Sequence, residues 1–268
     1  MINGMEVIDA HCHIYPEKIV TRAVAGTDHF YDTVARCIGT VADLLAEHDE
    51  AGIDRAVVQS VATTPKQVPS INRFIAESVE AANGRLIGLG TLHQDSEDQA
   101  ADVRHIVELG LHGVKLHPDI QNFQVDDPRA ERIYELCGEY GLPLLVHTGD
   151  KRYDNSNPDR MLPMVRKYRN VTFVGAHFGG WSIWEEAWKE YAGEPNFWVD
   201  CSSTFYWISV ETANEVLHHY GADRVLFGTD FPMWKPKTEL DTFMKLDLTD
   251  DERRIILAEN AKKVFRFD

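Results

Sequence analysis

The run VIDAHCH (residues 7–13) carries two histidines at the end of a short apolar stretch that predicts a β-strand. Side chains alternate along a strand, so His11 and His13 are expected on one face and Cys12 on the other. Two imidazoles on one face of one element are suited to chelate a metal ion. A single pair of histidines is equally compatible with packing, so the meaning of this motif depends on what the rest of the chain brings beside it.

The strand that carries this motif, residues 5–10, is the first of eight β-rich runs. The other seven runs are 55–60, 86–92, 112–117, 143–148, 171–177, 197–203 and 224–230. They are continuously apolar rather than alternating, which is typical of parallel strands covered on both faces. Strand and helix alternate along the chain, as in a doubly wound open sheet or a barrel, and the count of eight favours an α/β fold of the (β/α)8 TIM-barrel type.

Helical periodicity and capping residues occupy the segments between the strands. Helices are predicted over 40–51, over 70–84 with Ser70 as the cap, over 128–141 and over 209–221, and Thr249 with Glu252 forms a capping box before the last helix. Residues 14–39 show no clear pattern, and this long segment is predicted to be a lid over the site or a contact surface for a second copy in a homodimer. No linker or repeat divides the chain, so a single domain is predicted over 1–268.

Composition excludes several classes of partner. The net charge of −16 and the pI near 5.1 argue against nucleic acid and against anionic membrane surfaces. The four cysteines are widely spaced, which favours free thiols in a reducing compartment, and no apolar run reaches the length of a membrane span. We therefore expect a cytoplasmic protein whose partner is a small-molecule substrate.

Ionisable residues recur where the predicted strands end. His117, His147, His177 and Asp230 lie at or near the ends of the fourth, fifth, sixth and eighth strands. In a barrel these ends form one rim, so the residues converge with His11 and His13. Such a cluster without a metal would bury polar groups at a cost, whereas neutral imidazoles and a carboxylate suit a divalent ion that keeps one position for water. Isolated histidines such as His48 are interpreted as ordinary core or surface residues.

The motifs at these strand ends resemble those of the amidohydrolase superfamily, in the branch that includes aminocarboxymuconate-semialdehyde decarboxylase. They are DAHCH (9–13), GVKLHP (113–118), LLVHTG (144–149), GAHFGG (175–180) and GTDFP (228–232), in the order of the family. The ending NAKKVF (260–265) also resembles the closing helix of the family. An isolated HxH is weak support, whereas this ordered set is specific.

The resemblance implies a role for each residue. His11, His13, His147 and Asp230 would ligate one divalent metal, zinc first and manganese second, while His177 hydrogen-bonds the metal-bound water and moves its proton. Asp230 would then be both ligand and catalytic proton acceptor. In binuclear relatives a carboxylated lysine on strand four bridges two metals, and Lys115 occupies that place, although we favour one metal. The other interpretation of Lys115 is an ammonium group that anchors the substrate.

Substrate recognition is assigned to residues beyond the strand ends. Arg152 is suited to grip a carboxylate, and Trp181 and Trp234 are suited to stack on a cyclic or unsaturated compound. The leading hypothesis is a metal-dependent hydrolase that attacks a small carboxylated ester, lactone or amide through a metal-activated water. Non-oxidative decarboxylation of a conjugated acid is the alternative. The short chain and the short connections between its strands favour hydrolysis over this alternative. A metal-binding or ligand-sensing barrel without turnover is the third reading.

Overall fold

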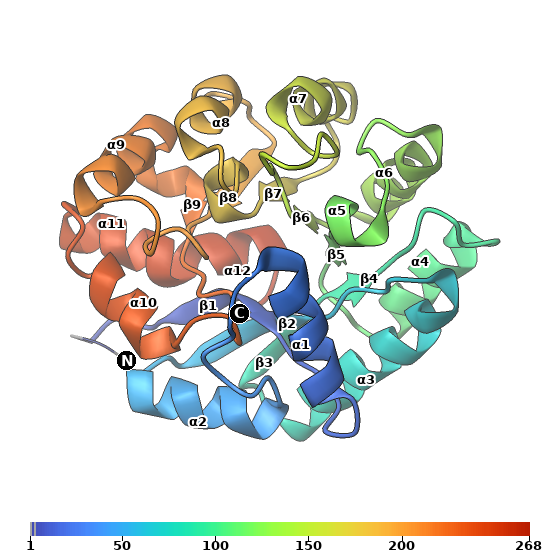
Figure 1. The fold of residues 1–268 in the computed structure, drawn as a ribbon, viewed down its shortest axis with the longest axis horizontal. Coiled ribbons are helices and arrows are strands. Elements are labelled where there is room, and N and C mark those ends of the chain that lie inside the picture. The colour runs from blue at the N-terminus through green and yellow to red at the C-terminus, as the bar shows by residue number, and fades with distance from the viewer. Residues whose placement is uncertain (1, 3) are drawn as a thin grey trace.

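The strands form one closed parallel barrel inside a ring of helices, as a computed structural model of the protein shows for residue 2 and residues 4–268 (Figure 1). The strands are β1 (Ile8–His13), β2 (Arg55–Gln59), β3 (Leu86–Gly88), β4 (Gly90–Thr91), β5 (Val114–Leu116), β6 (Leu144–Val146), β7 (Phe173–Gly175), β8 (Phe197–Asp200) and β9 (Val225–Leu226). The single strand expected over 86–92 is interrupted at Leu89, so β3 and β4 share one of the eight positions in the barrel.

Hydrogen bonds between the last and first strands close the barrel. Neighbouring strands pair in parallel from β1 to β3 and from β4 to β9. The amide of Ala10 donates to Phe227 O at 2.8 Å, and the amide of Asp230 donates to His11 O at 2.9 Å. These bonds join the last position of the barrel to the first and bring Asp230 beside β1. The predicted TIM barrel is confirmed.

A bulge in β1 sets the direction in which His11 and His13 point. Asp9 pairs with Ala56 and Cys12 pairs with Val58, so two residues of β1 face one residue of β2. Ile8 and Ala10 belong to the interior core of the barrel, while Cys12, just beyond the bulge, belongs to the outer core between strands and helices. His11 and His13 therefore face the mouth of the barrel, as the alternation of side chains predicts.

The helices lie outside the strands and explain the predicted periodicity. They are α1 (Val20–Tyr31), α2 (Val41–Ala51), α3 (Val68–Ala81), α4 (Gln99–Glu108), α5 (Pro118–Gln121), α6 (Pro128–Tyr140), α7 (Pro158–Lys167), α8 (Trp184–Tyr191), α9 (Val210–Tyr220), α10 (Pro236–Phe243), α11 (Asp250–Arg254) and α12 (Asn260–Phe265). A π-helical segment, Ile255–Glu259, joins the last two. The capping box of Thr249 with Glu252 starts α11 as predicted, and Ser209 caps α9 within the range 209–221 where a helix was predicted.

Two details of the predicted elements are wrong. Ser70 lies inside α3, which begins at Val68 because a 3-10 turn over Pro65–Gln67, with a capping box of Thr64 and Gln67, leads directly into it and Pro69 fits its first turn. The patternless segment 14–39 contains the helix α1, which lies across the barrel mouth in Figure 1. The four cysteines are free thiols, as expected. No helix among the described residues is long and apolar enough to cross a membrane.

Candidate metal centre and active site

Three of the four predicted metal ligands converge at the mouth of the barrel. His11 Nε2 lies 3.2 Å from His13 Nε2 and 3.4 Å from Asp230 Oδ1, and His13 Nε2 lies 3.6 Å from the same oxygen. The pKa values of both histidines are held well below the ordinary range, first by burial, so both imidazoles are neutral at pH 7. Two neutral imidazole nitrogens facing one carboxylate oxygen are a donor set that fits a divalent ion.

Asp200, at the end of β8, orients His11 within this set. Its Oδ2 accepts from His11 Nδ1 at 2.8 Å, and its Oδ1 accepts from the amide of His177 at 3.1 Å and from Ser202 Oγ at 2.5 Å. Because the Nδ1 hydrogen of His11 is engaged in this way, its Nε2 lone pair is left to face His13 and Asp230. A carboxylate behind a ligating histidine is the arrangement that fixes tautomer and ring direction in metal sites.

Lys115 of β5 reaches the same group of ligands. Its Nζ lies 3.1 Å from His11 Nε2, and the side chain is fully buried, which lowers its pKa to about 8. The inward direction predicted from strand parity is therefore observed. The ammonium and the carboxylated form of Lys115 both stay predictions.

His147 is placed beside His177 rather than among the three clustered ligands. His147 Nδ1 lies 3.0 Å from His177 Nε2, and its ring stacks on His117 with centroids 4.0 Å apart. The ring of His177 stacks in turn on His11 at 5.2 Å. The nitrogen or oxygen atoms that could bind a metal in His147, His117 and Asp119 lie within 4.8 Å of one another, apart from the group of His11, His13 and Asp230. The role of His147 as a fourth ligand therefore remains a prediction.

A cavity of about 1050 Å³ opens above these side chains, and all of the predicted substrate-binding residues line it. Trp181 is held by a hydrogen bond from its Nε1 to Tyr206 Oη at 3.1 Å, and Trp234 stacks on Tyr206 with centroids 3.9 Å apart. Tyr31 of α1 packs edge-on against Trp181. Aromatic side chains therefore form one part of the cavity wall, which suits a flat substrate.

Arg152 is placed at this cavity, but its guanidinium already has partners. Its Nε and Nη2 bind Asp150 at 3.0 and 2.7 Å, and its Nη1 donates to Phe30 O at 2.6 Å. The guanidinium also lies over the rings of Phe30, Tyr31 and Trp181. It therefore ties the end of α1 to the loop after β6, and its grip on a substrate carboxylate remains a prediction.

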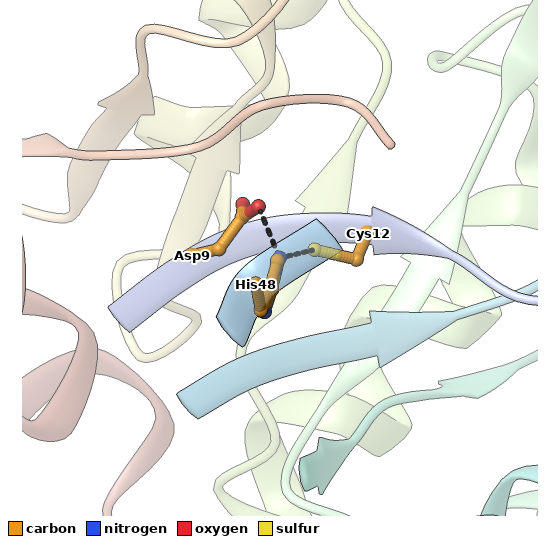
Figure 2. A group of neighbouring side chains, drawn as sticks. All are labelled: Asp9, Cys12 and His48. Atoms are coloured by element: carbon orange, nitrogen blue, oxygen red, sulfur yellow. Dashed lines mark hydrogen bonds and ion pairs between the residues drawn. The ribbon is translucent and has the colours of Figure 1, made fainter. Parts of the chain in front are cut away.

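On the other side of β1 from His11 and His13, Asp9 and Cys12 meet His48 in a buried group (Figure 2). His48 of α2 meets Asp9 Oδ2 at 3.2 Å and Cys12 Sγ at 3.9 Å. Asp9 accepts in addition from the amide and hydroxyl of Thr229, at 2.9 and 2.5 Å, and from the amide of His11 at 3.2 Å. Asp9 therefore holds the backbone next to Asp230 against the backbone of His11.

Sequence reasoning missed several of these residues. Asp200 is an acid in the run expected to be the seventh strand, where its position at a strand end was an available signal. Asp119 gave no usable signal, because its approach to His147 depends on the path of the segment that follows β5. Tyr31 lies in the segment 14–39 that was predicted as a lid or a contact surface, but its contacts with His117 and His147 were not predicted. His48 is a satisfied core residue, as interpreted.

A comparison with protein families agrees with the motifs. The family model named Amidohydro_2 and described as amidohydrolase matches residues 8–267. The chain belongs to the amidohydrolase family. A curated 2-amino-3-carboxymuconate-6-semialdehyde decarboxylase from Dictyostelium discoideum is 32% identical to this amidohydrolase over 97 residues, which are 35% of this chain and 27% of that protein. The matched segment thus spans about a quarter of the relative.

Solved structures share the whole barrel with this amidohydrolase. A 5-carboxyvanillate decarboxylase from Sphingomonas paucimobilis superposes with a TM-score of 0.78 at 18% identity, covering 99% of this chain and 100% of that chain. A dihydroxybenzoic acid decarboxylase from Polaromonas, solved with bound manganese and 2-nitroresorcinol, gives a TM-score of 0.73 at 18% identity over 98% and 97% of the two chains. At such identities the likeness shows the fold.

Proposed function

We propose that this amidohydrolase is a divalent-metal-dependent, non-oxidative decarboxylase of a small aromatic or conjugated carboxylic acid. The observation that carries the proposal is the neutral pair of His11 and His13 with Asp230 at the base of a cavity that aromatic side chains border. The decarboxylases named among its relatives support this choice over hydrolysis. The short chain no longer favours hydrolysis, because the superposition covers 97% or more of the two solved decarboxylase chains.

His11, His13 and Asp230 are the described residues that would hold the ion, with His147 proposed as the fourth ligand. When bound, a divalent ion would attract the substrate carboxylate and stabilise negative charge on the substrate. The Tyr206 hydroxyl and Ser203 secure the walls around this position: Tyr206 holds Trp181, and Ser203 Oγ accepts from Trp234 Nε1 at 2.8 Å. A flat substrate ring would stack on these aromatic side chains, which would displace water from its faces.

Decarboxylation breaks the bond between the carboxylate and the ring carbon, leaves the electron pair on that carbon, and requires one proton there. Asp230 and His177 are the site residues assigned to that proton. Burial raises the pKa of Asp230 to about 7, and Ser203 Oγ donates to its Oδ2 at 2.5 Å, which leaves Oδ1 on the side of the histidines. His177 is buried beside His11 with its Nδ1 bound to Ser202 O, so the nitrogen that we propose for proton transfer is Nε2, which faces His147 Nδ1 at 3.0 Å.

The test is a substrate panel with the protein supplemented with manganese or zinc. The panel contains 2,6-dihydroxybenzoate, 5-carboxyvanillate, conjugated dienoic acids and lactones, and release of carbon dioxide is followed together with product mass. We expect carbon dioxide release and, in D2O, one deuterium on the carbon that lost the carboxylate. His13→Ala should abolish turnover, while the exposed control His218→Ala should not. Ring opening of a lactone without carbon dioxide would instead establish a hydrolase and refute the proposal.

A further inference from the structure

The cavity above the metal centre is basic, although the chain as a whole is acidic. Its lining contains six lysine or arginine residues and three aspartate or glutamate residues, whereas the whole chain has 27 of the former and 43 of the latter. A concave site with an excess of one sign of charge attracts ligands of the opposite sign. The ligand of this cavity is therefore expected to be an anion.

Three of these basic residues lie apart from the metal centre: Lys18, Arg22 of α1 and Arg73 of α3. All three side chains are exposed, so they border the open part of the cavity, whereas Lys115 at its base is fully buried. With the rest of the described chain they form no observed hydrogen bond or ion pair. Unlike Arg152, whose guanidinium already binds a carboxylate, they are available to an anion from solution.

Helix α1 runs from these basic residues to the metal centre. Arg22, Gly26 and Phe30 follow one another at one turn of spacing and all line the cavity, so one face of α1 borders it along most of the helix. At the end of α1, Tyr31 contacts His117. Arg22 precedes Tyr31 by nine residues, which is about 13 Å along the helix axis. The basic residues are therefore placed for a second group of an elongated ligand.

The size and the apolar part of the lining agree with such a ligand. The cavity of about 1050 Å³ is as large as the clefts of about 300–1,000 Å³ that hold drug-sized ligands, so a single-ring acid fills only part of it. The same faces of α1 and α3 contribute Ala23, Ile71 and Phe74 to the lining. An apolar body between two acidic ends would match these surroundings.

The acidic residues of the lining do not cancel the basic ones. Besides Asp230 they are Asp32, next to the end of α1 at the metal centre, and Glu77 of α3. Glu77 follows Arg73 by one turn, but no ion pair between them is observed within the described residues. One carboxylate thus stands against three basic side chains at the open part of the cavity.

We propose that Lys18, Arg22 and Arg73 form a subsite for a second anionic group of the substrate. The substrate would then be an elongated acid, with one carboxylate at the metal centre and a carboxylate or phosphate at its far end. The reaction at the first carboxylate rests on the proposed function, whereas binding at the subsite does not. Arginine suits either group, because its guanidinium forms paired hydrogen bonds with both.

The experiment compares linear aromatic acids of one, two and three rings that carry an acidic group at one end or at both. For the two-ring compound, the second group is a carboxylate or a phosphonate. These acids carry no ring hydroxyl. Dissociation constants are measured by tryptophan fluorescence on metal-free and zinc-loaded protein at low ionic strength, because Trp181 and Trp234 line the cavity and salt screens exposed charges.

We expect the second acidic group to tighten binding at least about fivefold for the two-ring or three-ring acid, and less than about twofold for the one-ring acid. The larger gain among the two-ring compounds identifies carboxylate or phosphate as the preferred group. Arg22→Gln with Arg73→Gln in one chain should reduce the gain to below twofold and leave the monoacids within twofold of wild type. Both positions are exposed, so the fold should be unaffected.

Arg104→Gln with Lys245→Gln is the matched control, because both residues are exposed, lie outside the lining and remove the same charge. This control should keep the gain. No gain in wild type, or an equal loss for monoacids and diacids in the Arg22 and Arg73 variant, would overturn the subsite. A gain without carbon dioxide release from any substrate of the panel would refute the proposed function alone.

Discussion

Replacing Asp200 by asparagine changes one atom behind the metal centre and tests how His11 is prepared as a ligand. The asparagine side chain keeps one accepting oxygen, and the lower-cost orientation leaves this oxygen with the amides of His177 and Ser202, which lie 3.1 and 3.0 Å from Asp200 Oδ1. The amide nitrogen then faces His11 Nδ1, where the carboxylate oxygen accepts at 2.8 Å. His11 is forced to accept at Nδ1 and to carry its hydrogen on Nε2, the atom proposed as the metal ligand.

The expected loss is large enough to measure. Partners that orient ligating histidines typically change metal affinity by about 10- to 100-fold, which corresponds to about 1.4–2.7 kcal/mol. Zinc and manganese affinities would be measured by competition with a chelator, together with denaturant unfolding of the metal-free proteins. Glu215→Gln, at an exposed position of α9, removes the same charge and is the control. An affinity of Asp200→Asn within twofold of wild type would refute the assignment of Asp200 as the residue that orients His11.

Three further predictions concern the surroundings of the site. Gly228→Ala would place a Cβ 3.0 Å from His11 Cβ, so unfolding free energy should fall by about 1–3 kcal/mol in urea titrations, and an unchanged value would show that the approach is not tight. Asp9→Asn leaves one of its donors, such as the Thr229 hydroxyl, without an acceptor and should lower the unfolding free energy by about 1–3 kcal/mol in the same assay. An unchanged unfolding free energy would show that Asp9 does not stabilise the contact between the first and last strands. Burial raises the pKa of Glu239 to about 8, so the unfolding free energy of wild type falls as pH rises from about 4.5 through 8. The unfolding free energy of Glu239→Gln relative to wild type should therefore rise across this window, by more than about 1 kcal/mol at pH 9. Parallel stability curves of the two proteins would contradict this.

The barrel and its rim were predictable because their signals are local. A short apolar run followed by an ionisable residue indicates both a strand and the position where that strand ends. Parallel packing in a barrel then brings the carboxyl ends of the strands together. This logic placed His11, His13 and Asp230 near one another without any knowledge of the contacts between them.

The parts that escaped prediction depend on irregular backbone and on distant contacts. Simple alternation puts Asp9 on the same face as His11, but the bulge between Asp9 and Cys12 turns Asp9 to meet His48 on α2. Tyr31 lies in a segment without periodicity, and its two partners are 86 and 116 positions away in sequence. No pattern within a window of the sequence encodes such contacts, so only the folded chain reveals them.

Metal content is the most direct test of the central claim that His11, His13 and Asp230 hold a divalent ion. Elemental analysis would be made on the protein purified from manganese- or zinc-supplemented medium, beside His11→Ala with His13→Ala in one chain, and His218→Ala as the control. We expect one ion per chain in wild type and in His218→Ala, and none in the double variant. A wild-type protein that holds no divalent ion after supplementation, or a double variant that keeps its ion, would contradict the claim.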